Sequence, residues 1–210
     1  METGLLQAVT RYVEDVMGDE GFRYISAVVA NCKMLALQLD ANEEDVSSFD
    51  QDALIIAAYF HDISTTKDSI HDHHFRSAEM AAQFLREYGM PEERINKVEQ
   101  IVLAHTLAVS SDQRKSYLLE GRVLYDADKL GRLSGLAVVT SLIEFGARYP
   151  NRSVTGEVLA AILRHIEERF VELYQSLNTE PARDMAREKF GRTLAFLDGV
   201  IEHLGDATPV

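Results

Sequence analysis

The chain has 210 residues, 46% of them hydrophobic, and a formal net charge of −13. A chain of this length can bury roughly 70% of the surface that it exposes when unfolded, and it fits one domain. Its single cysteine, Cys32, excludes an intramolecular disulfide and fits a reducing compartment as a buried, inert thiol. The excess of acidic over basic residues argues against binding a nucleic-acid polymer, which needs clustered Lys and Arg.

The first half of the chain is predicted to be helical. Apolar periodicity predicts helices over residues 3–17, 21–39, 50–61, 73–88 and 91–105. The first of these ends near Gly18, and Pro91 fits the opening turn of the last. Residues 50–61 are apolar almost all round, which is typical of a central buried helix.

The second half continues the same pattern. Residues 106–121 are irregular or form a short helix, and longer helices are predicted over 122–146, 155–177 and 179–204. Ser153 or Thr155 is the expected N-cap of the penultimate helix. Strand patterns and internal repeats are nearly absent from the sequence. We therefore expect an all-α helical bundle, with one domain over residues 1–205 and a frayed tail over 206–210.

The sequence carries no membrane or export signal. Its first twenty residues, METGLLQAVTRYVEDVMGDE, lack the basic lead and apolar core of a signal peptide. A run of about 18 apolar residues, as a transmembrane helix needs, is also missing. We expect a cytoplasmic protein without a membrane partner.

The stretch AAYFHDIST, residues 57–65, ends an apolar helix on His61 and Asp62. Imidazole and carboxylate are the usual ligands of Mn, Fe, Co, Ni and Zn. Both side chains can face one cavity because the helical pattern stops at this point. A single His-Asp pair nevertheless arises by chance in many proteins, so further groups are needed.

Further histidines and aspartates fall at predicted helix ends. His74 opens one helix, His105 closes another, and Asp126 and Asp128 begin a third in LYDADKLGRL. Several helices of a bundle can aim such side chains into one pocket. The remaining histidines are expected at the surface: His71, His73, His165 and His203.

The motifs FHDIS, HFRSAEMAAQFL, IVLAH and DADKL, in this order, resemble the HD-domain superfamily of metal-dependent phosphohydrolases. The likeness extends over roughly residues 15 to 200. It implies an HD-like helical bundle and a divalent metal (Mn, Mg, Co, Ni or Fe) held by His61, Asp62 and Asp128. It also implies a small phosphorylated substrate, with Asp126 close to the ligands or facing the substrate.

The resemblance also implies catalytic and substrate-binding roles. Asp62 would steer the attacking water, and His74 or His105 would protonate the leaving oxygen. At these two positions some relatives have histidines that hold a second metal or contact phosphate. The basic residues nearest the motifs are the candidates for holding phosphate: Lys129, Arg76, Arg114 and Lys67. Arg76 is also well explained as a solvated surface residue.

One position departs from the family pattern. The family begins with a histidine on the second helix, where this chain has Tyr24, and a phenol with a pKa of about 10 is a poor metal ligand at neutral pH. Three outcomes are open: His74 or His105 substitutes, water fills the position, or the metal is lost. Tyr24 itself is expected to be a core aromatic whose hydroxyl is hydrogen-bonded.

These features favour a metal-dependent phosphohydrolase acting on nucleotides or another small phosphate ester or anhydride. The alternative is a weakly active or inactive HD-like module that binds a nucleotide or a partner protein. A di-iron oxygenase on the same bundle is a third hypothesis, which needs a fuller set of histidine ligands. The oligomeric state is open, with a homodimer among the possibilities.

Overall fold

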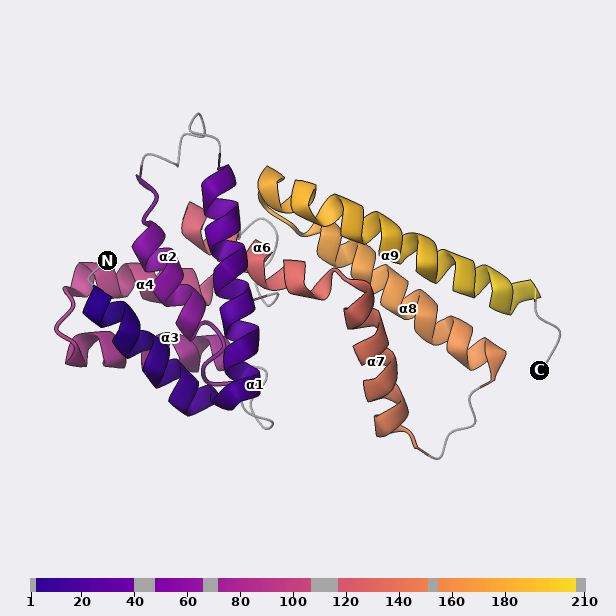
Figure 1. Ribbon diagram of the computed structural model, residues 1–210, viewed down its shortest axis with the longest axis horizontal. Coiled ribbons are helices and arrows are strands. Elements are labelled where there is room, and N and C mark those ends of the chain that lie inside the picture. Colours follow the sequence, from indigo (N-terminus) through magenta and orange to yellow (C-terminus); the bar gives the residue numbers. More distant parts are fainter. Residues whose placement is uncertain (1–2, 40–47, 66–71, 107–116, 151–154, 207–210) are drawn as a thin grey trace. The chain divides into compact units, whose positions relative to one another are not determined.

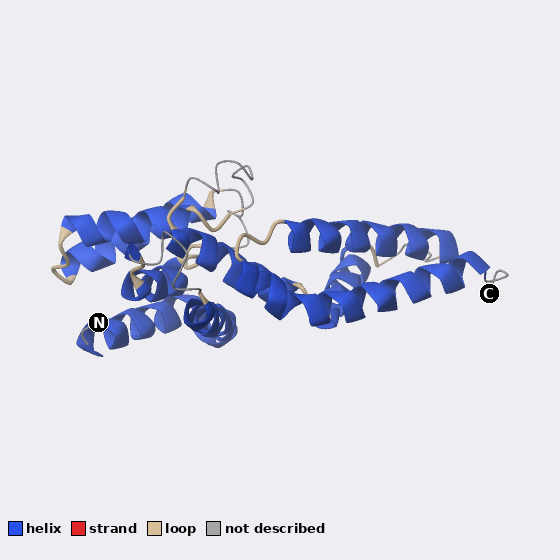
Figure 2. Ribbon diagram, turned by 90° about the horizontal axis from the view of Figure 1, so that it is seen from above, coloured by secondary structure: helices blue, strands red, loops and turns tan. Residues whose placement is uncertain are grey.

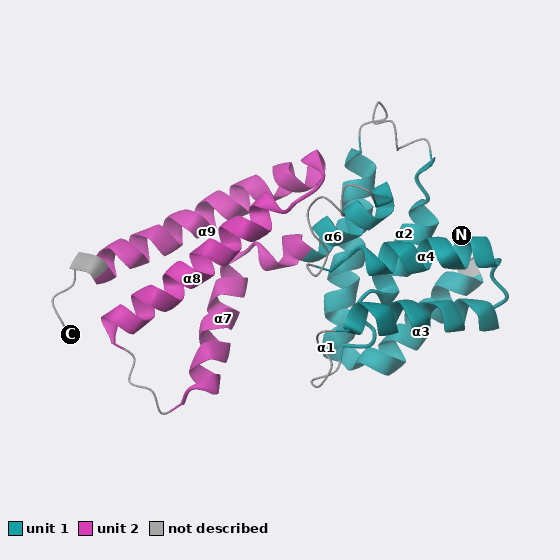
Figure 3. Ribbon diagram, turned by 180° about the vertical axis from the view of Figure 1, so that it is seen from behind, with its two compact units in different colours: residues 1–128 teal, residues 129–210 magenta. Residues whose placement is uncertain are grey.

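The computed structural model describes residues 3–39, 48–65, 72–106, 117–150 and 155–206. These residues form helices and no strands, as predicted (Figures 1 and 2). The helices are α1 (Thr3–Gln38), α2 (Gln51–Phe60), α3 (His73–Glu87), α4 (Glu92–Leu103), α6 (Leu119–Arg132), α7 (Gly135–Arg148), α8 (Gly156–Gln175) and α9 (Glu180–Asp206). The chain divides into two compact units, residues 1–128 and 129–210 (Figure 3). The expectation of one domain over residues 1–205 stays a prediction.

A kink at Gly18 divides α1. This residue has φ 65° and ψ 179°, a conformation that is nearly restricted to glycine, and the structure thereby places the expected break between residues 17 and 21. Val9 and Val13 before the kink and Ile25 after it are fully buried. The kink therefore lets both halves of one helix bury apolar faces in the same unit.

The central helix of the first unit is α2, as its apolar sequence predicted. Seven of its ten residues are buried, and it packs against α1, α3 and α4. Its N-cap is Asp50, whose side chain accepts a hydrogen bond from the backbone N–H of Ala53. Glu120 connects this end of α2 to α6, because its side chain accepts a 2.6 Å hydrogen bond from the Asp50 N–H. Glu120 also forms a 2.7 Å ion pair with Lys97.

The prediction of a single helix over residues 122–146 is wrong. Two helices, α6 and α7, occupy this stretch, and the helical backbone is interrupted at Leu133 and Ser134. Ser134 has an extended backbone, and its hydroxyl accepts a hydrogen bond from the N–H of Ala137, so it caps a new helix. The apolar pattern continues through the break, which is why periodicity alone did not reveal it.

The second unit has its own small core. Its buried centre consists of Val138 from α7, Leu163 from α8 and Leu197 from α9. The long helices α8 and α9 pack along each other (Figure 1), and Phe170 and Tyr174 stack on Phe190 between them. None of the described helices has, by itself, the length and apolar composition needed to cross a membrane; α6 and α7 reach these only when taken together.

Replacing Gly18 with alanine should destabilise the first unit by about 1–3 kcal/mol, because a Cβ makes its backbone conformation costly. Urea denaturation followed by circular dichroism measures the free energy of unfolding. Gly131→Ala is the matched control, since Gly131 is helical and a Cβ there meets no neighbouring atom. Equal stability of the two variants would contradict the assigned strain.

Candidate metal centre

His61 lies at the end of α2 and is completely buried. Its Nδ1 is 2.7 Å from the carbonyl oxygen of Ala58, one of the last carbonyls of α2 that lack a helical partner. This contact assigns the ring proton to Nδ1 and leaves a lone pair on Nε2. Nε2 makes no hydrogen bond within the described residues and lies 3.6 Å from Oδ2 of Asp62. A buried ring nitrogen of this kind is suited to bind a cation.

His105 repeats this arrangement just beyond the end of α4. Its Nδ1 bonds to the carbonyl oxygen of Val102, three residues earlier, so Nε2 again carries the lone pair. This Nε2 lies 3.3 Å from Oδ1 of Asp62. Two helix ends thus present imidazole Nε2 atoms to one carboxylate.

His73, the first residue of α3, completes the group. Its Nε2 is 3.3 Å from Oδ1 of Asp62 and 3.3 Å from Nε2 of His105. Ligand atoms of Asp62, His73 and His105 all lie within 4.8 Å of one another. The expectation that His73 is exposed at the surface is therefore wrong, since this side chain is only 18% exposed.

The ionisation states suit a metal centre. Burial alone would raise the pKa of the Asp62 carboxyl, but three neighbouring imidazoles outweigh it and hold this pKa below its usual range. Burial lowers the pKa of His61, although Asp62 and Asp128 oppose the effect. At neutral pH the site therefore offers a carboxylate and a neutral imidazole, which are the forms that bind metals.

His74 follows His73 in the sequence but makes different contacts. It is buried, its ring packs on that of Phe75 with 4.1 Å between centroids, and its Nδ1 makes no hydrogen bond within the described residues. Burial, reinforced by His73 and His105, lowers its pKa. Of the two histidines predicted to be catalytic, His74 has a buried nitrogen without a hydrogen bond among the described residues, whereas both nitrogens of His105 face partners.

Asp126 and Asp128 on α6 are both buried. The hydroxyl of Tyr24 donates a hydrogen bond to Oδ1 of Asp128, and the Tyr24 ring lies 6.2 Å from the His61 ring. This confirms that the Tyr24 hydroxyl is hydrogen-bonded. Burial and the two aspartates raise the pKa of the nearby Cys32 thiol, so Cys32 is protonated at neutral pH.

The predicted phosphate-binding residues have different surroundings. Arg76 is exposed and lines a hollow of about 430 Å³ against α3, together with Ile63, Ser64 and Met80. Lys129 is buried. Arg114 and Lys67 lie outside the described residues, as does His71. His165 and His203 are exposed, as expected.

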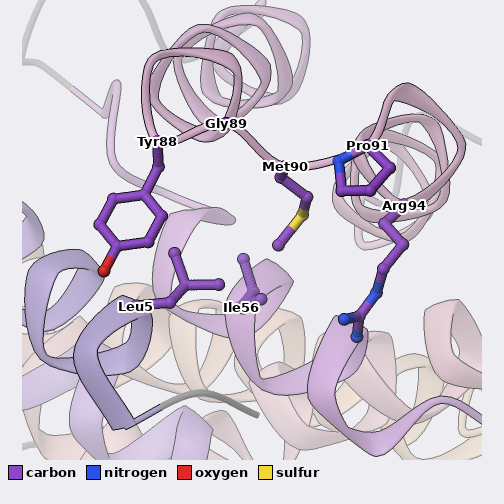
Figure 4. A pocket seen from close by; sticks show the side chains of 7 residues that line it. All are labelled: Leu5, Ile56, Tyr88, Gly89, Met90, Pro91 and Arg94. Carbon is purple, nitrogen blue, oxygen red and sulfur yellow. The ribbon is translucent and has the colours of Figure 1, made fainter.

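A second hollow, of about 230 Å³, is formed by α1, α2 and the turn between α3 and α4 (Figure 4). Leu5 and Ile56 form its apolar floor, and Arg94 reaches its edge. Arg94 is also 3.5 Å from Oδ2 of Asp50. This hollow shares no lining residue with the histidine cluster, so it is not part of the candidate metal centre.

Comparison with known families decides the relationship of this chain. The HD domain profile matches residues 25–133, which is more than half of the sequence and includes His61, Asp62, His105 and Asp128. The chain belongs to the HD domain family. The family resemblance stated from its motifs is thereby confirmed.

Several solved structures have the same fold. Bacillus subtilis YpgQ in complex with ADP is 18% identical, with a TM-score of 0.67 and 93% of each chain covered. An HD-superfamily hydrolase from Bacillus thuringiensis is 17% identical, with a TM-score of 0.70 and 99% of this chain and 100% of that one covered. A predicted HD superfamily hydrolase from an uncultured Thermotogales bacterium is 20% identical, with a TM-score of 0.60 and coverages of 94% and 92%. No curated protein matches the sequence.

Loss of His73 or His105 should weaken cobalt binding at least tenfold, because each removes a nitrogen that faces Asp62. Isothermal titration calorimetry of the alanine variants measures the dissociation constant. His165→Ala, an exposed histidine on α8, is the control and should bind as the wild type does. Unchanged affinity in both site variants would disprove the assigned ligands.

Proposed function

We propose that this HD protein is a metal-dependent phosphohydrolase that acts on a small phosphate ester or anhydride such as a nucleotide. The observation that carries the proposal is the Asp62 carboxylate, which faces the Nε2 atoms of His61, His73 and His105 at 3.3–3.6 Å. The donor set fits a divalent cation, because nitrogen and carboxylate oxygen are ligands of Mn, Fe, Co, Ni and Zn. Asp62, His73 and His105 would hold this ion, and His61 is close enough to join them.

A bound divalent cation would act as a Lewis acid: it would polarise a phosphoryl oxygen and lower the pKa of a coordinated water. The protein's residues would perform the remaining tasks. Asp62 orients the reacting groups and stays ionised, as its lowered pKa requires. His74 is the candidate for proton transfer, because burial lowers its pKa, which keeps the ring neutral, and its buried Nδ1 makes no hydrogen bond within the described residues.

Substrate binding requires positive charge in an acidic protein with a net charge of −13. One bound divalent cation can change the electrostatic potential at such a site from negative to positive. Arg76 is the described cation on the α3 hollow beside Ser64, and Ser64 in turn donates a 2.7 Å hydrogen bond to the His73 carbonyl. We assign Arg76 to the phosphate or the leaving group. The ADP complex of YpgQ, a protein of the same fold, supports a nucleotide as the first substrate class to test.

The alternative function is an HD module that binds a nucleotide or a partner protein without turnover. The specific observation in its favour is the hydroxyl of Tyr24, which donates a hydrogen bond to Asp128 at the position where the motifs led us to expect a ligand histidine. Metal content separates the two functions, because a binding module does not need the ion.

Hydrolysis should be found in a screen of nucleoside phosphates and sugar phosphates with Mn²⁺, Co²⁺, Ni²⁺ or Mg²⁺, followed by phosphate release. Asp62→Asn should lower the rate about a hundredfold or more, since the carboxylate faces all three imidazoles. Asp15→Asn, an exposed carboxylate on α1, should leave the rate unchanged. A metal-loaded protein that hydrolyses nothing in the screen, or an Asp62→Asn variant at full rate, would refute the proposal.

A further inference from the structure

The hollow against α3 begins next to the candidate metal centre. Ser64, two residues after Asp62, lines it, and the Ser64 hydroxyl donates a hydrogen bond to the His73 carbonyl. Its volume of about 430 Å³ is typical of small-molecule sites, which measure roughly 300–1,000 Å³. A substrate whose phosphate lies at Asp62 and His73 therefore has room for its remaining atoms beside α3.

Apolar side chains form one part of the lining. They are Val16 of α1, Ile63 from the turn after α2, and Met80 of α3. Val16 is 46% exposed although it is a large apolar residue, whereas Ile63 is buried. A methionine thioether packs well against aromatic rings. This part of the hollow suits the flat face of a nucleobase.

The polar part of the lining includes two hydrogen-bond acceptors on α3, Glu79 and Gln83. The Gln83 amide nitrogen donates a 3.1 Å hydrogen bond to Glu87, so the Gln83 carbonyl oxygen is left as an acceptor. The Glu79 carboxylate makes no hydrogen bond or ion pair among the described residues. The two residues therefore favour a base edge that carries donors.

Arg76 and Glu79 are both available to a ligand. They are three residues apart on α3, and at this spacing opposite charges pair elsewhere in the chain, as Arg183 and Glu180 do at 3.1 Å. Arg76 and Glu79 do not pair with each other in the structure. The guanidinium can thus face a phosphate while the carboxylate faces a donor.

The order of these residues along α3 matches the order of groups in a nucleotide. His73, Arg76 and Glu79 follow one another at three-residue intervals, and each interval advances about 4.5 Å along the helix axis. Glu79 is therefore roughly 9 Å farther along α3 than the end that faces Asp62. A nucleotide with its phosphate at His73 and Arg76 extends its base in this direction.

We propose that the Glu79 carboxylate selects guanine nucleotides by accepting hydrogen bonds from the guanine N1–H and 2-amino group. Guanine places these two donors side by side on its pairing edge, which matches the two oxygens of one carboxylate. Adenine and cytosine present a single amino donor beside a ring acceptor, which a carboxylate repels. The inference rests on the proposed function, because it uses the phosphate position assigned there, and it specifies the base of the substrate.

The test compares guanosine monophosphate (GMP) with inosine monophosphate (IMP), whose base lacks only the 2-amino group, and with AMP. Isothermal titration calorimetry of the full-length protein in EDTA measures base recognition without turnover. Wild type should bind GMP about tenfold more tightly than IMP or AMP, because an unmatched acceptor costs binding energy. Glu79→Gln should bring GMP and IMP within about threefold of each other.

Two further variants keep this test specific. Glu93→Gln, which changes an exposed carboxylate on α4 outside the hollow, should keep the wild-type preference for GMP. Met80→Ala should weaken all three nucleotides to a similar extent, because the three bases make the same contact through their ring faces. Circular dichroism establishes that each variant is folded.

The outcomes separate this inference from the proposed function. Equal affinity of the wild type for GMP and IMP, or a folded Glu79→Gln variant that keeps the preference for GMP, would overturn the guanine assignment alone. A chain that prefers GMP through Glu79 but hydrolyses no phosphate compound with any of the metals would overturn the phosphohydrolase proposal and leave the base site in place.

Discussion

Two backbone carbonyls determine the chemistry of the centre. The carbonyl oxygens of Ala58 and Val102 each accept the Nδ1 proton of a histidine three residues later, at the ends of α2 and α4. Helices leave their last carbonyls without partners, and these two use a side chain to satisfy them. The same bonds turn the Nε2 lone pairs of His61 and His105 toward Asp62. A local requirement of helix termination thus produces a site that attracts cations.

The surrounding fold serves to bring these helix ends together. Because α2 is apolar almost all round, it becomes the centre of the first unit, and α1, α3 and α4 pack on it. Its C-terminal end therefore lies inside the protein, where His61 is completely buried. Burial in turn lowers the pKa of His61 and keeps the ring neutral. The metal centre depends on the position of α2 as much as on its own residues.

The sequence predicted much of this arrangement because helix periodicity and helix ends are local properties. The break at Gly18, the buried α2 and the placement of His61, Asp62 and His105 at helix ends all follow from them. His73 was missed because adjacent residues on a helix point about 100° apart, and the sequence does not say which of two neighbouring histidines faces Asp62. The α6–α7 break was missed because apolar residues continue through Ser134.

The contact between Tyr24 and Asp128 joins residues 104 positions apart, which no local pattern reports. Position 24 provides a hydroxyl donor to this buried carboxylate. The candidate ligand atoms of His73 and His105 gather around Asp62.

Anomalous diffraction from crystals grown with Mn²⁺ tests this account most directly, because it locates the ion without reference to activity. We expect one anomalous peak within bonding distance of Asp62 and of the Nε2 atoms of His73 and His105. A peak that is not bonded to Asp62, or no peak in crystals soaked with excess Mn²⁺, would contradict the account.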